Sequence, residues 1–97
     1  MFSARLITHD NTRMLNICDS NLLDKTLTRG KFTLKISKSY YGERIVGKKE
    51  AEDLLRKCDN INMVGKKIVD LSTSLGIGSL SGVKIIDGIP FLIVLRM

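Results

Sequence analysis

Few side chains in this sequence are of the types that act as nucleophiles or metal ligands. Cys18 stands beside Asp19, and Cys58 lies forty residues further along without a Cys-x-x-Cys pair. Because His9 is the only histidine, a zinc site of two cysteines and two histidines cannot form within one chain. A nucleophilic Cys18 would need a base, and Asp19 activates a thiol poorly. We therefore expect two buried, free cysteines, as suits a reducing cytosol, with no metal and no cofactor.

Two other motifs that resemble functional sites have structural explanations. His9 and Asp10 are neighbours in a predicted turn, where such pairs more often face solvent than act in catalysis. Gly76-Ile77-Gly78 follows a predicted helix, whereas a dinucleotide-binding glycine motif follows a strand. The sequence also lacks GxSxG, a P-loop, a paired-carboxylate setting and a metal-ligand cluster. These absences favour a binding module over an enzyme.

Positive charge is concentrated in residues 25–49. Eight Lys and Arg residues stand there against one acid, Glu43, which gives +7, while the remainder of the chain sums to −1. The segment is either a solvated face or a site for phosphate groups, most plausibly those of RNA; an acidic partner protein would fit the same charge. Tyr40 and Tyr41 lie inside it, and aromatic rings beside cations can stack on unpaired bases. The structural alternative buries one tyrosine in the core and leaves the other on the surface.

The candidate nucleic-acid-binding residues all come from this segment. They are Lys25, Arg29, Lys31, Lys35, Lys38, Tyr40, Tyr41 and Arg44.

The elements that must position these residues begin with strands. A β-hairpin is predicted over 2–8 and 13–18, because Asp and Asn in the intervening segment favour a turn. Asp19 is predicted to cap a short helical turn. A strand is then predicted over 31–37 from its strict alternation of apolar and polar residues. That alternation directs Phe32, Leu34 and Ile36 to the core, and Lys31, Thr33, Lys35 and Ser37 outward.

Two amphipathic helices are predicted next. The first covers residues 48–57, and the second begins at Asn60 as its cap and ends at Gly76. The apolar stripe of the second helix is Ile61, Val64, Ile68, Leu71 and Leu75. Two more strands, over 83–86 and 89–95, are predicted to meet at the turn Asp87-Gly88.

Length and pattern together indicate one α+β domain over residues 1–97. The chain of 97 residues suffices for one hydrophobic core. We expect a two-layer sandwich of about five strands with the two helices on one face. The longest uncharged stretch, residues 71–83, is too short and too polar to cross a membrane, and the N-terminus lacks the apolar region of a signal peptide. A cytoplasmic protein is therefore expected.

An ordered set of short motifs resembles the archaeal proteins grouped as domain-of-unknown-function family 424. The resemblance runs from about residue 15 to residue 90. The motifs are Cys18-Asp19, Leu22-Leu23, Lys25-Thr26, Arg29-Gly30, Leu34, Ile36-Ser37, Tyr41-Gly42, Ile61-Asn62-Met63-Val64-Gly65, Val83, Ile85 and Gly88-Ile89-Pro90.

The resemblance implies an archaeal, cytoplasmic α/β protein and no established activity. Family members are often encoded beside translation genes, which implies an association with the ribosome or tRNA. This chain departs from the family pattern at Asp24, where glycine is common. It also departs over 91–95, where the family has a histidine and polar residues and this chain is apolar. Any chemical role of that histidine is therefore missing here.

Three functions follow from these observations. The first is a translation-associated module that binds RNA or the ribosome through a basic strand face. The second is a protein-interaction or assembly module, in which the apolar strand over residues 89–95 pairs with a partner or forms a homodimer. An enzyme centred on Cys18-Asp19 is the least favoured of the three.

Overall fold

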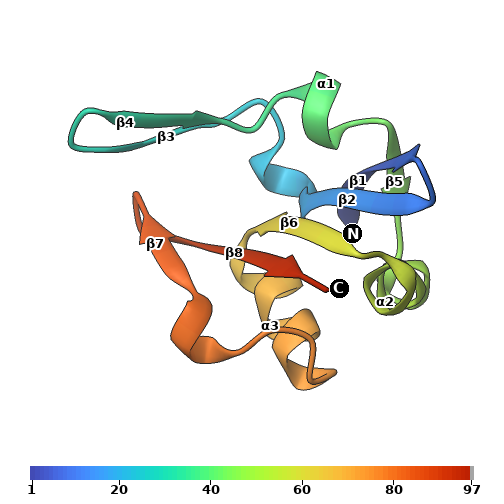
Figure 1. The fold of residues 1–97 in the computed structure, drawn as a ribbon. Coiled ribbons are helices and arrows are strands. Elements are labelled where there is room, and N and C mark those ends of the chain that lie inside the picture. Colours follow the sequence, from blue (N-terminus) through green and yellow to red (C-terminus); the bar gives the residue numbers. More distant parts are fainter. Residues whose placement is uncertain (97) are drawn as a thin grey trace.

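Eight strands and three α-helices form residues 1–96, the part of the chain described by the computed structural model (Figure 1). The six-stranded sheet has the order β5-β1-β2-β6-β8-β7, with β2 and β6 as its one parallel pair. Its strands are β1 (Phe2–His9), β2 (Thr12–Asp19), β5 (Arg44–Val46), β6 (Asn60–Val64), β7 (Lys84–Ile86) and β8 (Ile89–Leu95). The predicted α+β class is confirmed, with eight strands instead of about five.

The remaining elements lie outside the large sheet. β3 (Thr26–Arg29) and β4 (Phe32–Lys35) form a separate two-stranded antiparallel sheet. The helices are α1 (Lys38–Tyr41), α2 (Lys48–Lys57) and α3 (Lys66–Ser74), and two short 3₁₀ helices are η1 (Ser20–Leu22) and η2 (Leu80–Gly82). No helix within residues 1–96 is both long and apolar enough to cross a membrane.

The N-terminal hairpin forms where the sequence predicts it. β1 and β2 pair from Phe2–Asp19 to His9–Thr12, so that only Asp10 and Asn11 remain in the turn. Both residues have positive φ, 48° and 66°, which Asn and Asp tolerate better than most residues and which a two-residue hairpin turn requires. Asp and Asn are therefore the turn-forming residues, as the sequence predicts.

The predicted helix over residues 60–76 is wrong in its first third. Asn60–Val64 is the strand β6, and the helix α3 begins only at Lys66. Gly65 separates the two elements with φ +125°, a conformation that residues with a Cβ rarely adopt. The alternation Asn60-Ile61-Asn62-Met63 fits a strand, and pairing with β2 and β8 on both sides stabilises it. Gly76, at φ +76°, follows the end of α3 as predicted.

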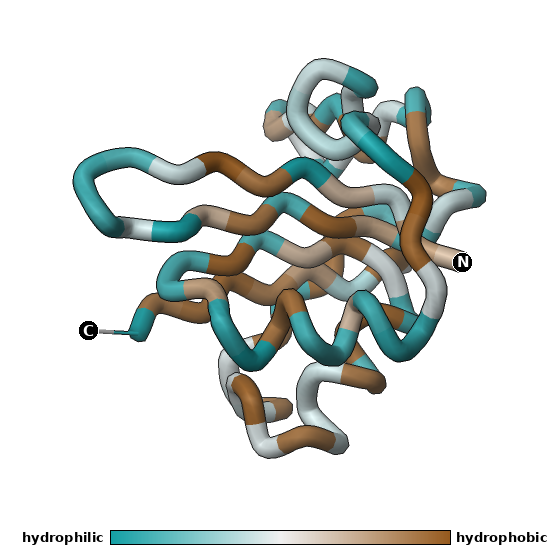
Figure 2. Tube along the Cα trace, turned by 90° about the vertical axis from the view of Figure 1, so that its right-hand side faces the viewer, coloured by the Kyte–Doolittle hydropathy of each residue, from teal (hydrophilic) through white to brown (hydrophobic). Residues whose placement is uncertain are grey.

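α2 and α3 cover one face of the six-stranded sheet, which we call the helix face. Side chains from alternate positions of neighbouring strands point to this face, and hydrophobic and hydrophilic positions alternate along the strands in Figure 2. This places the two predicted amphipathic helices on one face of the sheet. The fully buried residues between the layers include Leu15, Ile17, Leu55, Ile61, Met63 and Ile68.

The opposite face of the sheet is covered only at one end. There α1, η1 and the β3-β4 hairpin lie across the sheet from α2 and α3 (Figure 1). They enclose a second apolar cluster of Cys18, Leu22, Leu27, Ile36, Tyr41, Val64 and Ile86. Beyond this cluster the sheet carries Arg5, Ile7, Met14, Asn16, Asn62, Ile93 and Leu95, and we call this region the open face. A two-layer sandwich therefore describes the molecule only roughly, because part of the sheet has a third layer.

The predicted strand over residues 31–37 is shorter than expected and lies outside the large sheet. It spans Phe32–Lys35 and pairs with β3, with Gly30 and Lys31 in the turn between them. Leu34 and Phe32 share a face, as predicted, but Phe32 is 56% exposed. The hairpin extends beyond the second cluster at this point, and no layer remains for Phe32 to contact.

The last strand spans Ile89–Leu95 as predicted. Asp87 and Gly88, both with positive φ, form the predicted two-residue turn that joins β7 to β8. Leu92 is buried on the helix face. Ile93 and Leu95 lie on the open face, where they are 51% and 70% exposed. On this side of the strand, Ile89 and Phe91 pack against the second cluster, and the part beyond them is uncovered within residues 1–96.

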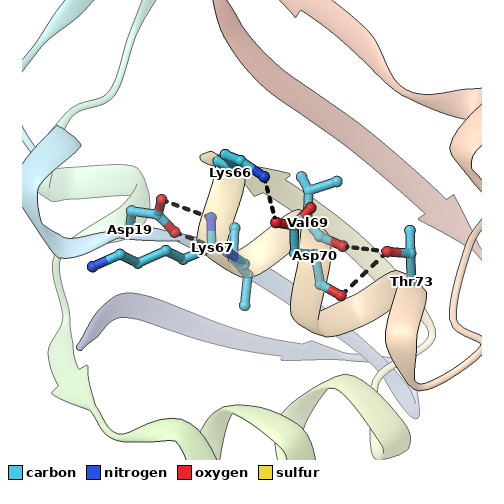
Figure 3. Close-up of polar contacts among 7 residues, drawn as sticks. Asp19, Lys66, Lys67, Val69, Asp70 and Thr73 are labelled. Carbon is cyan, nitrogen blue, oxygen red and sulfur yellow. Dashed lines mark hydrogen bonds and ion pairs between the residues drawn. The ribbon is translucent and has the colours of Figure 1, made fainter.

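The Asp19 carboxylate joins the end of β2 to the start of α3 (Figure 3). Its oxygens accept hydrogen bonds from the backbone N–H groups of Lys67, at 3.0 Å, and Ile68, at 2.9 Å. These donors have no partner within the helix. A Cβ at Gly65 would collide with this carboxyl group, so the sequence needs glycine there. Asp19 is thus a cap, but for α3 and not for the short turn that directly follows it.

Asp19→Ala is expected to lower the free energy of unfolding by about 2 kcal/mol, because it leaves two helix N–H groups, one buried and one part-buried, without an acceptor. Chemical denaturation followed by circular dichroism measures this change. Asp53→Ala, on the exposed surface of α2, is the matched control and should cost no more than ~0.5 kcal/mol. Equal losses for the two variants would contradict the capping role of Asp19.

Candidate nucleic-acid interface

Four of the predicted binding residues lie together on the β3-β4 hairpin. We call residues 25–35 the ribbon; it carries Lys25, Arg29, Lys31 and Lys35, all exposed. Lys38, Tyr40 and Tyr41 belong to α1, which follows directly at the base of the ribbon. Arg44 begins β5, at the far edge of the large sheet. The structure therefore brings most of the predicted residues together and leaves Arg44 apart.

The base of the ribbon is fixed while its tip stands away from the body of the molecule (Figure 1). Leu27 and Ile36 are buried in the second cluster, and the Ile36 N–H donates to the Lys25 carbonyl oxygen at 2.9 Å. Arg29 Nη1 donates to the Ile85 carbonyl oxygen of β7 at 3.4 Å. These contacts fix the orientation of the ribbon relative to the large sheet. Gly30 and Lys31 form its turn.

The cations of the ribbon have no acidic partners among residues 1–96. Lys38 is 3.5 Å from Asp24, and Arg44 is 2.9 Å from Glu50, both as exposed ion pairs. Lys25, Arg29 and Lys31 make no such pair within the described chain, and residues 25–42 contain no acid. The Asp87 carboxylate lies beside the ribbon, where it accepts a hydrogen bond from the Thr28 N–H at 3.4 Å. The side chains of Lys25, Arg29 and Lys31 nevertheless stay without an ion pair within the described chain, so they are available to an external anion.

The two tyrosines have different environments. Tyr41 is buried in the second cluster, where its carbonyl oxygen accepts a hydrogen bond from Ser3 Oγ at 2.9 Å. Burial, and to a lesser degree the proximity of Cys18, raises the pKa of Tyr41 to about 12. Tyr40 is 61% exposed and is the one of the two available to stack on a base.

A groove of about 590 Å³ lies on the open face beside α1. It is lined by Ile7, Met14, Asn16, Leu34, Lys35, Tyr40, Tyr41, Asn62 and Phe91. On its floor Asn62 Nδ2 donates to Asn16 Oδ1 at 2.8 Å. Neither asparagine is among the residues predicted from the sequence, although the alternation of polar and apolar residues over 60–63 indicates that Asn62 faces away from the core.

A second cavity, of about 490 Å³, lies on the helix side of the molecule. Its lining includes Lys48 and Lys67 but also Asp70, together with Phe2 and Leu71. Since its charges are mixed and it has no exposed aromatic residue, it suits a polyanion less well than the ribbon does.

The Cys18-Asp19 pair is not arranged for nucleophilic chemistry. Cys18 is fully buried, and burial, with a contribution from the Asp19 charge, raises the pKa of its thiol from 9.0 to about 12. The Asp19 carboxylate faces the α3 backbone instead of acting as a base toward the thiol. Cys58 is also buried, and burial raises its pKa. Both thiols are free, as predicted.

The remaining polar candidates are isolated. His9 Nε2 lies 3.2 Å from Asp10 Oδ2 in the exposed hairpin turn, as the sequence predicts. Within residues 1–96, no three His, Cys, Asp or Glu side chains converge in a way that could hold a metal ion.

Both thiols are expected to react slowly in the folded protein at pH 8, since burial keeps them protonated and shielded. Titration with a thiol reagent, with and without denaturant, measures this protection. A thiol that reacts at the rate of free cysteine in the folded protein would contradict this arrangement.

Because the Cys18 pKa is higher in the folded state, the free energy of unfolding should fall as the pH rises from about 9 toward 12. Cys18→Ala should reduce that fall.

Comparison with known proteins gives a family and a fold. The family model described as "Protein of unknown function (DUF424)" matches residues 7–97. The crystal structure of an uncharacterized conserved protein from Methanopyrus kandleri is similar, with a TM-score of 0.76 and 20% identity over 99% of this chain and 93% of that chain. At this identity the similarity shows the fold alone, and no curated protein matches. The resemblance predicted from the motifs is confirmed: the chain belongs to the DUF424 family.

Proposed function

We propose that this protein is a translation-associated RNA-binding module that contacts RNA, or the ribosome, through the ribbon and α1. The observation that carries this proposal is the positive charge of the ribbon, whose Lys25, Arg29 and Lys31 form no ion pairs within residues 1–96. The ribbon is anchored by Leu27 and Ile36 in the second cluster. Because the phosphate backbone attracts cations whatever its sequence, such an extension is suited to RNA. The translation association that the family resemblance implies favours RNA over DNA.

The alternative of a merely solvated surface accounts less well for this distribution. On α2, Lys48, Lys49, Arg56 and Lys57 are interspersed with Glu50, Glu52 and Asp53, as on an ordinary soluble surface. On the ribbon no acid separates the cations. Phe32, 56% exposed at the ribbon tip, adds an aromatic ring to the same surface. Exposed rings beside cations are the combination that binds unpaired bases and phosphates together.

Binding to a structured RNA is expected to weaken steeply as salt increases. Four to six phosphate contacts give a slope of roughly −3 to −5 in a plot of log K against log salt concentration. Filter binding or fluorescence anisotropy at several salt concentrations measures the slope. A response that stays flat between low and physiological salt would remove RNA as the partner.

Charge reversal on the ribbon should weaken this binding and make the salt slope shallower by about 2, roughly one for each lost phosphate contact. The variant is Lys25→Glu with Lys31→Glu, both exposed and without ion pairs within residues 1–96. Lys49→Glu with Lys57→Glu changes the net charge equally on α2 and is the matched control. If the two double variants lose affinity equally, net charge and not the ribbon attracts the RNA.

We propose assembly through β8 as a second candidate function. β7 pairs only with residues 89–91, so within the described chain no strand pairs with the outer edge of residues 92–95. Ile93 and Leu95 are exposed on the adjoining open face. A free strand edge with exposed apolar side chains can pair with its copy in a two-fold dimer.

This candidate predicts a dimer mass in light scattering at micromolar concentration, because the exposed residues of β8 would be buried between two copies. Ile93→Lys should convert the dimer to a monomer. Ile45→Lys, at an equally exposed position on β5, should leave the mass unchanged. A monomer mass for the unmodified protein would contradict assembly and leave the RNA proposal intact.

A further inference from the structure

We infer that the groove on the open face is a subsite for an unpaired nucleobase of the bound RNA. The inference rests on the proposed function, since the ribbon supplies the phosphate contacts that bring a strand to this face. The ribbon contacts the phosphate backbone, whereas the groove offers groups that can form hydrogen bonds with a base and stack on it.

A row of side chains crosses four adjacent strands of the open face, and its two central members, Asn16 and Asn62, line the groove. The register aligns Arg5 of β1 with Asn16 of β2, Asn16 with Asn62 of β6, and Asn62 with Ile93 of β8. Aligned partners point to the same face of a sheet, and strands are spaced about 4.8 Å apart, so the row is about 14 Å long. Four-stranded faces of similar extent accommodate two or three bases in single-stranded RNA recognition.

The asparagine pair leaves hydrogen-bonding groups free toward the groove. Asn62 Nδ2 donates to Asn16 Oδ1, and this is the one hydrogen bond that either side chain makes within residues 1–96. The Asn16 Nδ2 donors and the Asn62 Oδ1 acceptor therefore remain available. They lie on neighbouring strands at paired positions. A base edge with an adjacent acceptor and donor is complementary to such a pair.

The rim of the groove supplies aromatic and cationic groups. Tyr40, 61% exposed, lines it from α1, and Lys35 lines it from the end of the ribbon. Arg5 Nη1 donates to the Ser39 carbonyl oxygen, which places a second cation between the sheet and α1. A base stacked on Tyr40 can therefore have its phosphate close to Lys35 or Arg5, and the strand continues onto the ribbon.

The asparagine pair and the cations at the rim favour a nucleotide over a wholly apolar partner in this groove. An apolar partner would bury the spare asparagine groups without replacing their hydrogen bonds to water, which is unfavourable. The apolar part of the groove, which includes Ile7, Met14, Leu34 and Phe91, can pack against the flat face of a base while the asparagines meet its polar edge.

The test compares two fluorescently labelled probes of equal length by anisotropy at one salt concentration. One is an eight-nucleotide oligouridylate, and the other is its abasic counterpart, which has the same phosphates and no bases. The wild type should bind oligouridylate at least about fivefold more tightly, as expected for one stacked and hydrogen-bonded base. Tyr40→Ala and Asn62→Ala should each reduce this preference and leave the affinity for the abasic probe unchanged.

Two further variants separate this inference from the proposed function. Tyr40→Phe keeps the aromatic ring and should keep most of the preference for oligouridylate. Lys25→Glu with Lys31→Glu should weaken the binding of both probes by the same factor. If Asn62→Ala does not fold, Tyr40→Ala still tests the base subsite, because Tyr40 is exposed and its replacement should not disturb the fold. Equal binding of the two probes, or a preference that survives Tyr40→Ala, would overturn the base subsite and leave ribbon binding standing. Binding to neither probe would overturn the proposed function as well.

Discussion

The hydrogen bonds of the Asp19 carboxylate to the first turn of α3 hold together the corner on which the rest of this fold depends. They connect residues 48 and 49 positions apart in sequence and fix the start of the helix against the end of β2. The parallel pairing of β2 with β6 ends at the same corner, where Gly65 leaves room for the carboxyl group. Because η1 follows Asp19 immediately, this corner also determines where the chain leaves the sheet toward the ribbon.

The uneven coverage of the sheet explains why its two faces differ in chemistry. Two helices enclose the helix face, and its positions on the central strands are fully buried apolar residues. The hairpin and α1 reach only one end of the other face. The remaining positions there include the hydrogen-bonded asparagine pair, in which Asn16 is 8% exposed and Asn62 is half-buried; an enclosed apolar core would not favour such a pair. A charged ribbon and a groove that combines this polar pair with apolar side chains therefore adjoin each other beside α1.

Local signals in the sequence predicted much of the fold. The Asp10-Asn11 and Asp87-Gly88 turns, the helix α2 and the limits of β8 each follow from turn chemistry or periodicity within a few residues. The division of residues 60–75 into a strand and a helix did not follow. Ile61 and Val64 fit a helical spacing as well as Ile61 and Met63 fit a strand, and long-range pairing with β2 decided between them.

The candidate site was predictable in charge but not in shape. The excess of Lys and Arg over residues 25–49 indicates the basic segment in which the ribbon lies. The partner of β4 is β3, a four-residue strand with little periodicity of its own, so the two-stranded extension could not be derived from the pattern. Asn16 and Asn62 meet only through the β2-β6 pairing, between segments 46 residues apart. Likewise, the burial of Tyr41 and the exposure of Tyr40 depend on how α1 lies against the sheet.

The residues that contact a bound RNA can be identified by NMR from the backbone amide signals that shift. In a titration of ¹⁵N-labelled protein with a short single-stranded RNA, we expect chemical-shift changes concentrated in residues 25–41. The amides of α2, on the far side of the sheet, should remain unchanged and serve as an internal control. Changes centred on α2 and α3, or no changes at low salt, would contradict the assignment of the ribbon and α1 as the RNA-binding surface.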